Sequence, residues 1–367
     1  CLVGGYMLLH RLLLVSLSIL FTPPAISEPT PVELRFLGWG YLPPFEENFK
    51  KIAAEHNLDV TITMVQPVIE MANDAFDALR SDTADVLMPG SHFFGDFNAR
   101  LFKLLHPIDT NQLSNYQFLQ PALSQAKFDA YQGDKYAVPH NGAVMRLIYN
   151  ADKVSTPPTS FLVLSEPENK GKVATSAIAE NSIIPLLLGL GYTAYEAQDY
   201  HHFRLSVPQL QTRATQLISN KQYYWQQVND VEKMRDISYS TSWGIEVSEA
   251  RASGQNWQFS EARGIQSLDT LAIAKKLSYQ PNKLKAAYLL INYLISEEYQ
   301  TAFVHAAPFI YPSNTQVAQH LTEEELELSR ANDPYYFNEA NMLRYRDKRT
   351  NNTYLRVWDK AQKDNKE

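Results

Sequence analysis

The sequence has almost no cysteine: Cys1 is the only one among 367 residues. A chain with a single thiol cannot form an internal disulfide, and it cannot assemble a cysteine-ligated metal site. Its stability must therefore come from a large hydrophobic core, and 367 residues with 45% hydrophobic composition are enough to form one. This length suits two lobes of roughly 150 residues each.

Positive charge is also scarce, because 33 Lys and Arg stand against 40 Asp and Glu and leave a formal net charge of −7. Without a basic patch, nucleic acid is not an expected partner. The chain also lacks a nucleophile elbow, a phosphate-binding loop and a His-Glu-x-x-His motif, and its histidines are not at metal-ligand spacing. We therefore predict a protein that is not an enzyme and that uses no metal or cofactor. A glycosidase-type carboxylate pair is the one catalytic alternative, and no sugar-binding features accompany it.

Long hydrophobic runs are missing as well. The apolar run at 12–21 is too short to span a membrane. It follows a short basic segment and precedes Ala25 and Ser27, which are small residues at the −3 and −1 positions of a cleavage site, as is typical of a secretory signal peptide. We expect residues 1–6 to lie upstream of the true start, cleavage between Ser27 and Glu28, and export of the mature protein to the periplasm.

Strand and helix patterns alternate along the rest of the chain. An apolar run at 34–37 ends at a glycine turn, and a helical pattern follows at 46–55. Such alternation predicts an α/β protein whose mainly parallel sheets are flanked by crossover helices. Further strand patterns lie at 58–65, 84–88, 144–149, 170–175, 236–240 and 268–273, and further helical patterns at 182–190, 207–218, 281–295, 297–305, 321–331 and 338–344.

The order of these patterns predicts a clamp whose chain crosses between two lobes three times, near 139–144, 266–270 and 311–314. In this division the first lobe comprises residues 28–139 and 270–312, the second lobe comprises 140–269 and 313–360, and 361–367 form a polar, frayed tail. We expect a monomer.

A turn with two aromatic rings, Gly38-Trp39-Gly40-Tyr41, follows the first strand pattern. Open α/β sheets bind ligands beyond the carboxyl ends of their strands. Rings at that position offer flat apolar walls and π faces that attract a cation. The residues alone leave open whether Trp39 and Tyr41 line a site or pack at the edge of a lobe.

Six short strings carry a family resemblance. They are Gly-Trp-Gly-Tyr at 38–41, Asp-Val-Leu-Met-Pro-Gly-Ser-His-Phe-Phe at 85–94, Lys-Tyr-Ala-Val-Pro at 135–139, Thr-Ser-Trp-Gly at 241–244, Leu-Asp-Thr-Leu-Ala-Ile at 268–273 and Tyr-Pro-Ser-Asn at 311–314. In this order the chain resembles, over residues 33–345, the periplasmic solute-binding proteins of ABC importers, and among them the spermidine/putrescine-binding branch. The resemblance implies a two-lobed type II periplasmic-binding-protein fold, with a mixed, mainly parallel sheet in each lobe and a ligand cleft between the lobes.

The family holds a polyamine between aromatic rings and carboxylates. The positions that match its ligand-binding residues are Trp39, Tyr41, Ser91, Phe93, Glu180, Trp243, Asp269 and Tyr311. Three departures stand out: only Glu180 remains of an acidic pair, Ser267 replaces a Trp two residues before Asp269, and Asn141 replaces another Trp. Fewer rings and fewer carboxylates leave the identity of the ligand open.

The chemistry of a polyamine explains why such a site needs both kinds of residue. Burying a CH₂ group between rings gains about 0.8 kcal/mol, whereas burying an unpaired ammonium costs several kcal/mol. Asp269 and Glu180 would each take a terminal amine, and Trp39 or Trp243 would face an inner amine. Each residue also has a purely structural interpretation. Asp269 would cap a turn, Glu180 would stabilise the N-terminus of a helix through the helix dipole, and Trp243 and Tyr311 would pack in the protein interior.

The resemblance implies a function in which the lobes close on a polyamine, such as spermidine, putrescine or norspermidine, and pass it to a membrane ABC permease. A periplasmic sensor that reports its ligand to a membrane-bound signalling receptor is the alternative, and the reduced set of rings and acids favours it slightly because it fits a longer polyamine. A binder of a non-amine solute is the third possibility. The tyrosine pairs at 223–224 and 335–336 would suit iron, but they lack matched His and acid neighbours.

Overall fold

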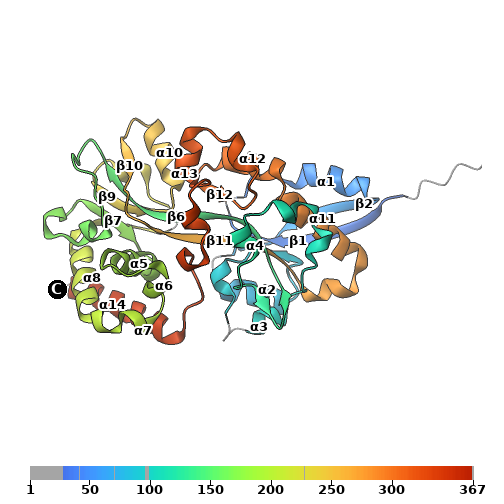
Figure 1. The fold of residues 1–367 in the computed structure, drawn as a ribbon, viewed down its shortest axis with the longest axis horizontal. Helices are drawn as coiled ribbons and strands as arrows, with labels where there is room; N and C mark the ends of the chain where they lie inside the picture. The colour runs from blue at the N-terminus through green and yellow to red at the C-terminus, as the bar shows by residue number, and fades with distance from the viewer. Residues whose placement is uncertain (1–27, 41, 70, 96–98, 227, 366–367) are drawn as a thin grey trace, which may run out of the picture.

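The computed structural model describes residues 28–365 except 41, 70, 96–98 and 227. The predicted signal peptide and Tyr41 therefore lie outside the described residues. Figure 1 shows two groups of strands and helices side by side, with the long strands β6 and β11 running between them. We call the group that contains β1 the first lobe and the group that contains β7 the second lobe.

The first lobe is built on parallel strands. β1 pairs in parallel with β2 on one edge and with β3 on the other. Alternate residues of β1, namely Val32, Leu34 and Phe36, are buried in a core that also contains α11. The elements are β1 (Thr30–Leu37), α1 (Glu46–Glu55), β2 (Leu58–Met64), α2 (Ala72–Arg80), β3 (Val86–Leu87), α3 (Ala99–Phe102), α4 (Pro121–Ser124), β4 (Ala130–Tyr131), β5 (Asp134–Lys135), α11 (Pro281–Leu294) and α12 (Glu297–Ala306).

The second lobe repeats this plan. β7 pairs in parallel with β8 and with β9, and its helices α5, α8 and α14 pack together over a separate core. The elements are β7 (Val173–Ser176), α5 (Ala179–Gly189), α6 (Ala194–Ala197), α7 (Tyr200–Phe203), α8 (Val207–Asn220), β8 (Lys221–Trp225), α9 (Val231–Met234), β9 (Tyr239–Ser242), α10 (Ile245–Ala252), β10 (Trp257–Phe259), α13 (Glu323–Ser329) and α14 (Lys348–Asp364).

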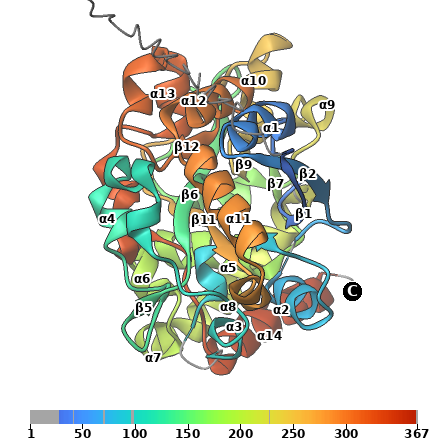
Figure 2. The same ribbon diagram turned by 90° about the vertical axis from the view of Figure 1, so that its right-hand side faces the viewer.

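Three strands lie between the two lobes: β6 (Val138–Asn150), β11 (Ile265–Ile273) and β12 (Ile310–Pro312). β11 pairs antiparallel with β3 of the first lobe and with residues 138–145 of β6, and the remainder of β6 pairs with β9 of the second lobe. Strands of both lobes thus form one continuous sheet in the order β2-β1-β3-β11-β6-β9-β7-β8, with β10 and β12 also paired to β6, while β4 and β5 form a separate two-stranded sheet. Figure 2 shows α11 in front of β6 and β11. The predicted α/β arrangement with mixed, mainly parallel sheets is confirmed.

The end of the chain differs from the prediction. Residues 338–344 do not form the predicted α-helix, and α14 continues to Asp364 although a frayed tail is predicted from about 360. The helix is held by an apolar stripe, because Tyr354, Val357, Trp358 and Ala361 are buried against the second-lobe core. The abundance of Lys, Arg and Asp between these residues hides the stripe in the sequence. Among the described residues, no helix is both long enough and apolar enough to cross a membrane.

Gly142 lies where the three crossing strands meet, because it pairs with Leu268 of β11 and with Tyr311 of β12. A Cβ at this position would lie 2.1 Å from the Ser267 carbonyl oxygen and 2.2 Å from the Tyr311 hydroxyl. We expect Gly142→Ala to lower the free energy of unfolding by about 1–3 kcal/mol or more, as measured by urea denaturation. Gly40→Ala is the matched control and should change stability by less than about 0.5 kcal/mol. A Cβ at this position would lie 3.9 Å from Cγ1 of Val68, which is an ordinary contact distance. Equal stability of the two variants would contradict this close approach of the strands.

Candidate functional site at the junction of the lobes

Two loops of the first lobe carry an aromatic cluster. They follow the carboxyl ends of β1 and β3, which is the edge where an open α/β sheet binds ligands. The Trp39 ring lies tilted against Phe93 at a centroid distance of 6.3 Å, and Phe93 meets His92 edge to face at 4.6 Å. Phe93 is buried and Trp39 is partly buried, and the enclosed Trp39 indole nitrogen has no hydrogen-bond partner among the residues that the structure describes. The predicted neighbours Trp39 and Phe93 are therefore in contact.

Asp269 lies beside these loops on the crossing strand β11. It pairs across the sheet with Asn141 and forms an isolated bridge with Gly90, and it is 4% exposed. The backbone N–H and hydroxyl of Thr270 both donate to the Pro89 carbonyl, at 2.9 and 2.8 Å, which fixes the loop against the strand. A buried carboxylate thus lies next to the loop that carries Ser91 and Phe93.

Tyr311 supports the crossing strands. It is completely buried, its hydroxyl donates to the Ser267 carbonyl at 2.9 Å, and its ring meets Phe337 edge to face at 5.6 Å. Burial, followed by the negative charge of Asp269, raises the pKa of Tyr311 well above its usual value. Tyr311 is therefore near Asp269, and these contacts are with the backbone of β11 and with a buried ring.

Trp243 follows β9 in the second lobe. Gly244 takes the left-handed conformation that glycine tolerates, with φ at 94°, and its N–H donates to the Ser242 hydroxyl at 2.7 Å. Trp243 is partly buried and packs against two second-lobe cores, whereas Ile245 two residues later packs against the first-lobe core. This turn therefore lies where the lobes meet.

Glu180 lies in the first turn of α5 and is engaged by a cation that the sequence reasoning did not single out. Nη1 of Arg346 donates to Oε1 of Glu180 at 2.7 Å, and Nη2 donates to Oε2. The Glu180 and Arg346 side chains are 22% and 10% exposed, so the pair is largely enclosed. Both oxygens of the carboxylate that is predicted to hold an amine thus face a guanidinium of the same chain.

The segment that carries Arg346 touches both lobes. In the first lobe, the Ser91 hydroxyl donates to the Leu343 carbonyl at 3.3 Å, and the Tyr345 ring lies directly against the backbone of Gly95. In the second lobe, Leu343 donates its N–H to the Gln266 carbonyl at 2.7 Å. Ser91 is therefore brought to the junction as predicted, with its hydroxyl bonded to this segment. We call residues 342–346 the junction segment.

His92 is a second residue that the sequence reasoning passed over. Its Nδ1 is enclosed and finds no hydrogen-bond partner within the described part of the chain, although the residue as a whole is partly exposed. Burial lowers the pKa of His92 to about 4, while Glu180 raises it and Arg346 lowers it by smaller amounts. Leu343 and Tyr345 of the junction segment contact Ser91 and Gly95 on either side of His92 in the chain, which brings the neighbouring Arg346 and its partner Glu180 near this histidine. Local sequence gives no sign of this contact, since the three residues are far apart in the chain.

The geometry thus brings together most of the predicted site. Trp39, Ser91, Phe93 and Asp269 gather on the first-lobe side and the crossing strands, and Glu180 and Trp243 approach from the second lobe. Tyr41 lies outside the described residues. Among the residues that the structure does describe, no three His, Cys, Asp or Glu side chains are grouped so that they could hold a metal ion.

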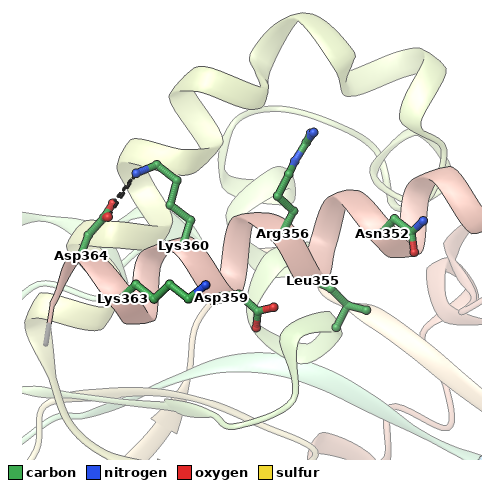
Figure 3. Close-up of a pocket in the computed structure, with 7 residues that line it drawn as sticks. All are labelled: Asn352, Leu355, Arg356, Asp359, Lys360, Lys363 and Asp364. Atoms are coloured by element: carbon green, nitrogen blue, oxygen red, sulfur yellow. Dashed lines mark hydrogen bonds and ion pairs between the residues drawn. The ribbon is translucent and has the colours of Figure 1, made fainter.

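A surface hollow elsewhere on the protein has a different character. It is lined along one face of α14 by Asn352, Leu355, Arg356, Asp359, Lys360, Lys363 and Asp364. Figure 3 shows these side chains spread along a single helix, with Lys360 paired to Asp364. Because its lining is formed by exposed, mostly charged side chains rather than by enclosed apolar and polar groups, this hollow is not a candidate ligand site.

Two α/β lobes joined by three crossing strands, with rings and carboxylates at the junction, define a bilobal solute-binding protein. Residues 47–329 match the family model described as bacterial extracellular solute-binding protein, and the chain belongs to that family. The family and the two-lobed fold predicted from the sequence are thus confirmed.

Solved structures with the same fold come from several bacteria. A spermidine/putrescine ABC transporter substrate-binding protein from Streptococcus pneumoniae has a TM-score of 0.70 and 16% identity, over 90% of this chain and 98% of that one. A putative spermidine/putrescine ABC transporter protein from Listeria monocytogenes has a TM-score of 0.67 and 17% identity with the same coverage. A periplasmic binding protein from A. tumefaciens in complex with glucopine has a TM-score of 0.61 and 16% identity, over 90% of this chain and all of that one. At these identities the likeness shows the fold.

The buried imidazole of His92 predicts a pH-dependent stability. Its pKa is about 4 in the folded protein and 6.5 without burial, so the unfolded chain binds the proton more tightly. The stabilisation is complete above pH 6.5 and is lost as the pH falls toward 4. Between pH 7.5 and 4.5, we expect His92→Gln to lose about 1–2 kcal/mol less unfolding free energy than the wild type, measured by urea denaturation. His56→Gln, at an exposed position, is the control, and the same pH slope in all three proteins would contradict the assignment.

Proposed function

We propose that this solute-binding protein captures an amine of the polyamine class between its lobes and delivers it to a membrane ABC permease. The observation that carries the proposal is the position of Asp269, a residue that is 4% exposed on a crossing strand and bridges to Gly90, at the start of the loop that carries Phe93 of the aromatic cluster. An ammonium that enters the junction loses its hydration, and a nearby carboxylate offsets that cost. A carboxylate at this position therefore favours a cationic ligand.

The rings supply the second requirement of an amine with a methylene chain. Trp39 and Phe93 come from the first lobe and Trp243 comes from the second, so closure of the lobes would bring apolar faces to both sides of a flexible chain. Each CH₂ enclosed in this way gains about 0.8 kcal/mol, and a nearby ring face also attracts an ammonium. The combination of an aromatic cluster and a buried carboxylate suits a cation with an apolar stem better than it suits a sugar or an anion.

Known relatives of this fold bind different ligands. Two of the structures compared above are named for spermidine and putrescine, while the third holds glucopine. The polyamine assignment therefore depends on the residues at the junction. Membership of the extracellular solute-binding family supports delivery to a permease. Reporting to a signalling receptor would use the same closure with a different membrane partner.

The first test removes the negative charge of Asp269. We expect the wild type to bind putrescine, spermidine or norspermidine in isothermal titration calorimetry, and Asp269→Asn to bind at least about tenfold more weakly, since removing one partner of a buried ion pair costs about 3–5 kcal/mol. Asp59→Asn is the matched control, because Asp59 is exposed on β2. If the wild type gives no heat with any of these amines, or if Asp269→Asn binds normally, the proposal is wrong.

The second test concerns the aromatic wall. We expect Trp39→Ala to weaken amine binding about tenfold or more, because it removes a large apolar face from the junction. Trp39→Phe should keep most of the affinity, and it should not destabilise the fold through hydrogen bonding, since no described residue accepts from the indole N–H. Fluorescence-monitored binding and thermal unfolding of both variants separate the two effects. A fall in melting temperature with unchanged affinity in Trp39→Ala would show that this residue only packs.

A further inference from the structure

The first turn of α14 holds the Arg346 side chain in the conformation that pairs with Glu180. Nε of Arg346 donates to the Asn351 side-chain oxygen at 3.0 Å, and the Asn351 amide donates back to the Arg346 carbonyl at 3.2 Å. Asp347 caps α14 by accepting from the Thr350 N–H at 2.7 Å. The first turn of α14 therefore orients both the backbone and the side chain of Arg346.

All three guanidinium nitrogens of Arg346 are engaged in this arrangement. Two donate to Glu180 and the third to Asn351, while the guanidinium carbon lies 5.8 Å from the centre of the buried Tyr354 ring. A fork that meets a carboxylate with two parallel bonds is the strongest form of this ion pair. These contacts hold the Arg346 side chain in one conformation. Arg346 is therefore a cation that the protein itself keeps at the Glu180 carboxylate, and we call it the resident cation.

The pair lies close to the first lobe, because the junction segment that carries Arg346 accepts a hydrogen bond from Ser91 at Leu343 and packs Tyr345 against Gly95. A ligand ammonium that reached Glu180 would meet a carboxylate whose charge is already neutralised and a guanidinium of its own sign. Like charges that lie close together in an enclosed site oppose each other, and an ammonium that gains no net countercharge keeps its full desolvation cost.

We infer that Arg346 is a specificity-determining residue, which occupies Glu180 as a resident cation and thereby limits how many ammonium groups the bound amine carries. This inference rests on the proposed function and refines it. In this scheme the junction discriminates against each additional ammonium that would extend toward Glu180, so triamines are disfavoured relative to diamines and monoamines of similar chain chemistry.

The test compares amines that differ in charge. Binding of butylamine, putrescine and spermidine is measured by calorimetry at pH 7 for the wild type and for Arg346→Gln. Loss of the resident cation leaves Glu180 able to pair with an ammonium, so we expect affinity for spermidine to rise about tenfold relative to butylamine. Glu180→Gln leaves Arg346 without its carboxylate, and it should shift the same ratio in the opposite direction.

Two matched variants separate charge from structure. Arg346→Lys keeps the cation and should retain the wild-type order of amines. Arg344→Gln removes a cation from the same segment whose guanidinium carbon lies 3.8 Å from the centre of the Tyr195 ring and which pairs with Asp199 at 3.7 Å. Since this arginine points to the second-lobe surface, its loss should also leave the order of amines unchanged.

The outcomes distinguish this inference from the proposed function. If the wild type binds amines but the spermidine to butylamine ratio is the same in Arg346→Gln and Glu180→Gln, the inference alone is overturned and the pair is only a structural contact. If neither the wild type nor any variant binds an amine, both are overturned. A lowered melting temperature in Arg346→Gln does not by itself change the ratio, which is why the ratio is the quantity compared.

Discussion

The pairing of β6 with β11 is the interaction on which the rest of the structure depends. These two strands carry hydrogen bonds through both lobes, so that neither sheet ends at the junction. Their close approach to β12 requires a residue without a side chain at Gly142, and the Tyr311 hydroxyl then reaches the Ser267 carbonyl. The register between β6 and β11 fixes how far along these strands the loops of each lobe begin. A shift of this register would move them by whole residues.

This crossing also fixes the position of an acidic residue at the junction. Asp269 lies on the strand itself, where its backbone is held by the sheet and its neighbours are fixed by Thr270 and the Pro89 loop. A buried charge on a loop would be free to move toward solvent, whereas one on a paired strand stays at the same place. The second carboxylate, Glu180, is placed by a helix start instead and is balanced by Arg346. The backbone of Asp269 is thus held by a paired strand, and that of Glu180 by the first turn of a helix.

The sequence predicts the crossings, the mixed sheets and the family, because these follow from local patterns and from strings that stay together along the chain. The family resemblance also singles out Trp39 and Phe93, and the structure places their rings in contact. The sequence does not predict the partner of Glu180. Arg346 is 166 residues away, and its position depends on α14, whose apolar stripe is interrupted by charged residues. Long-range side-chain contacts of this kind leave no periodic signal.

The helix that the sequence conceals is therefore the one that most changes the interpretation of the site. Without α14, Glu180 would be an acid in the first turn of a helix, and a terminal ammonium would be its natural partner. With α14 docked on α8 and α5, the junction segment is drawn across the Ser91 loop and Arg346 is presented to that carboxylate. Packing at the outer face of the second lobe thus determines the charge at the junction. It follows that selectivity in such a clamp can be set by residues that a comparison of ligand-contacting positions alone would not include.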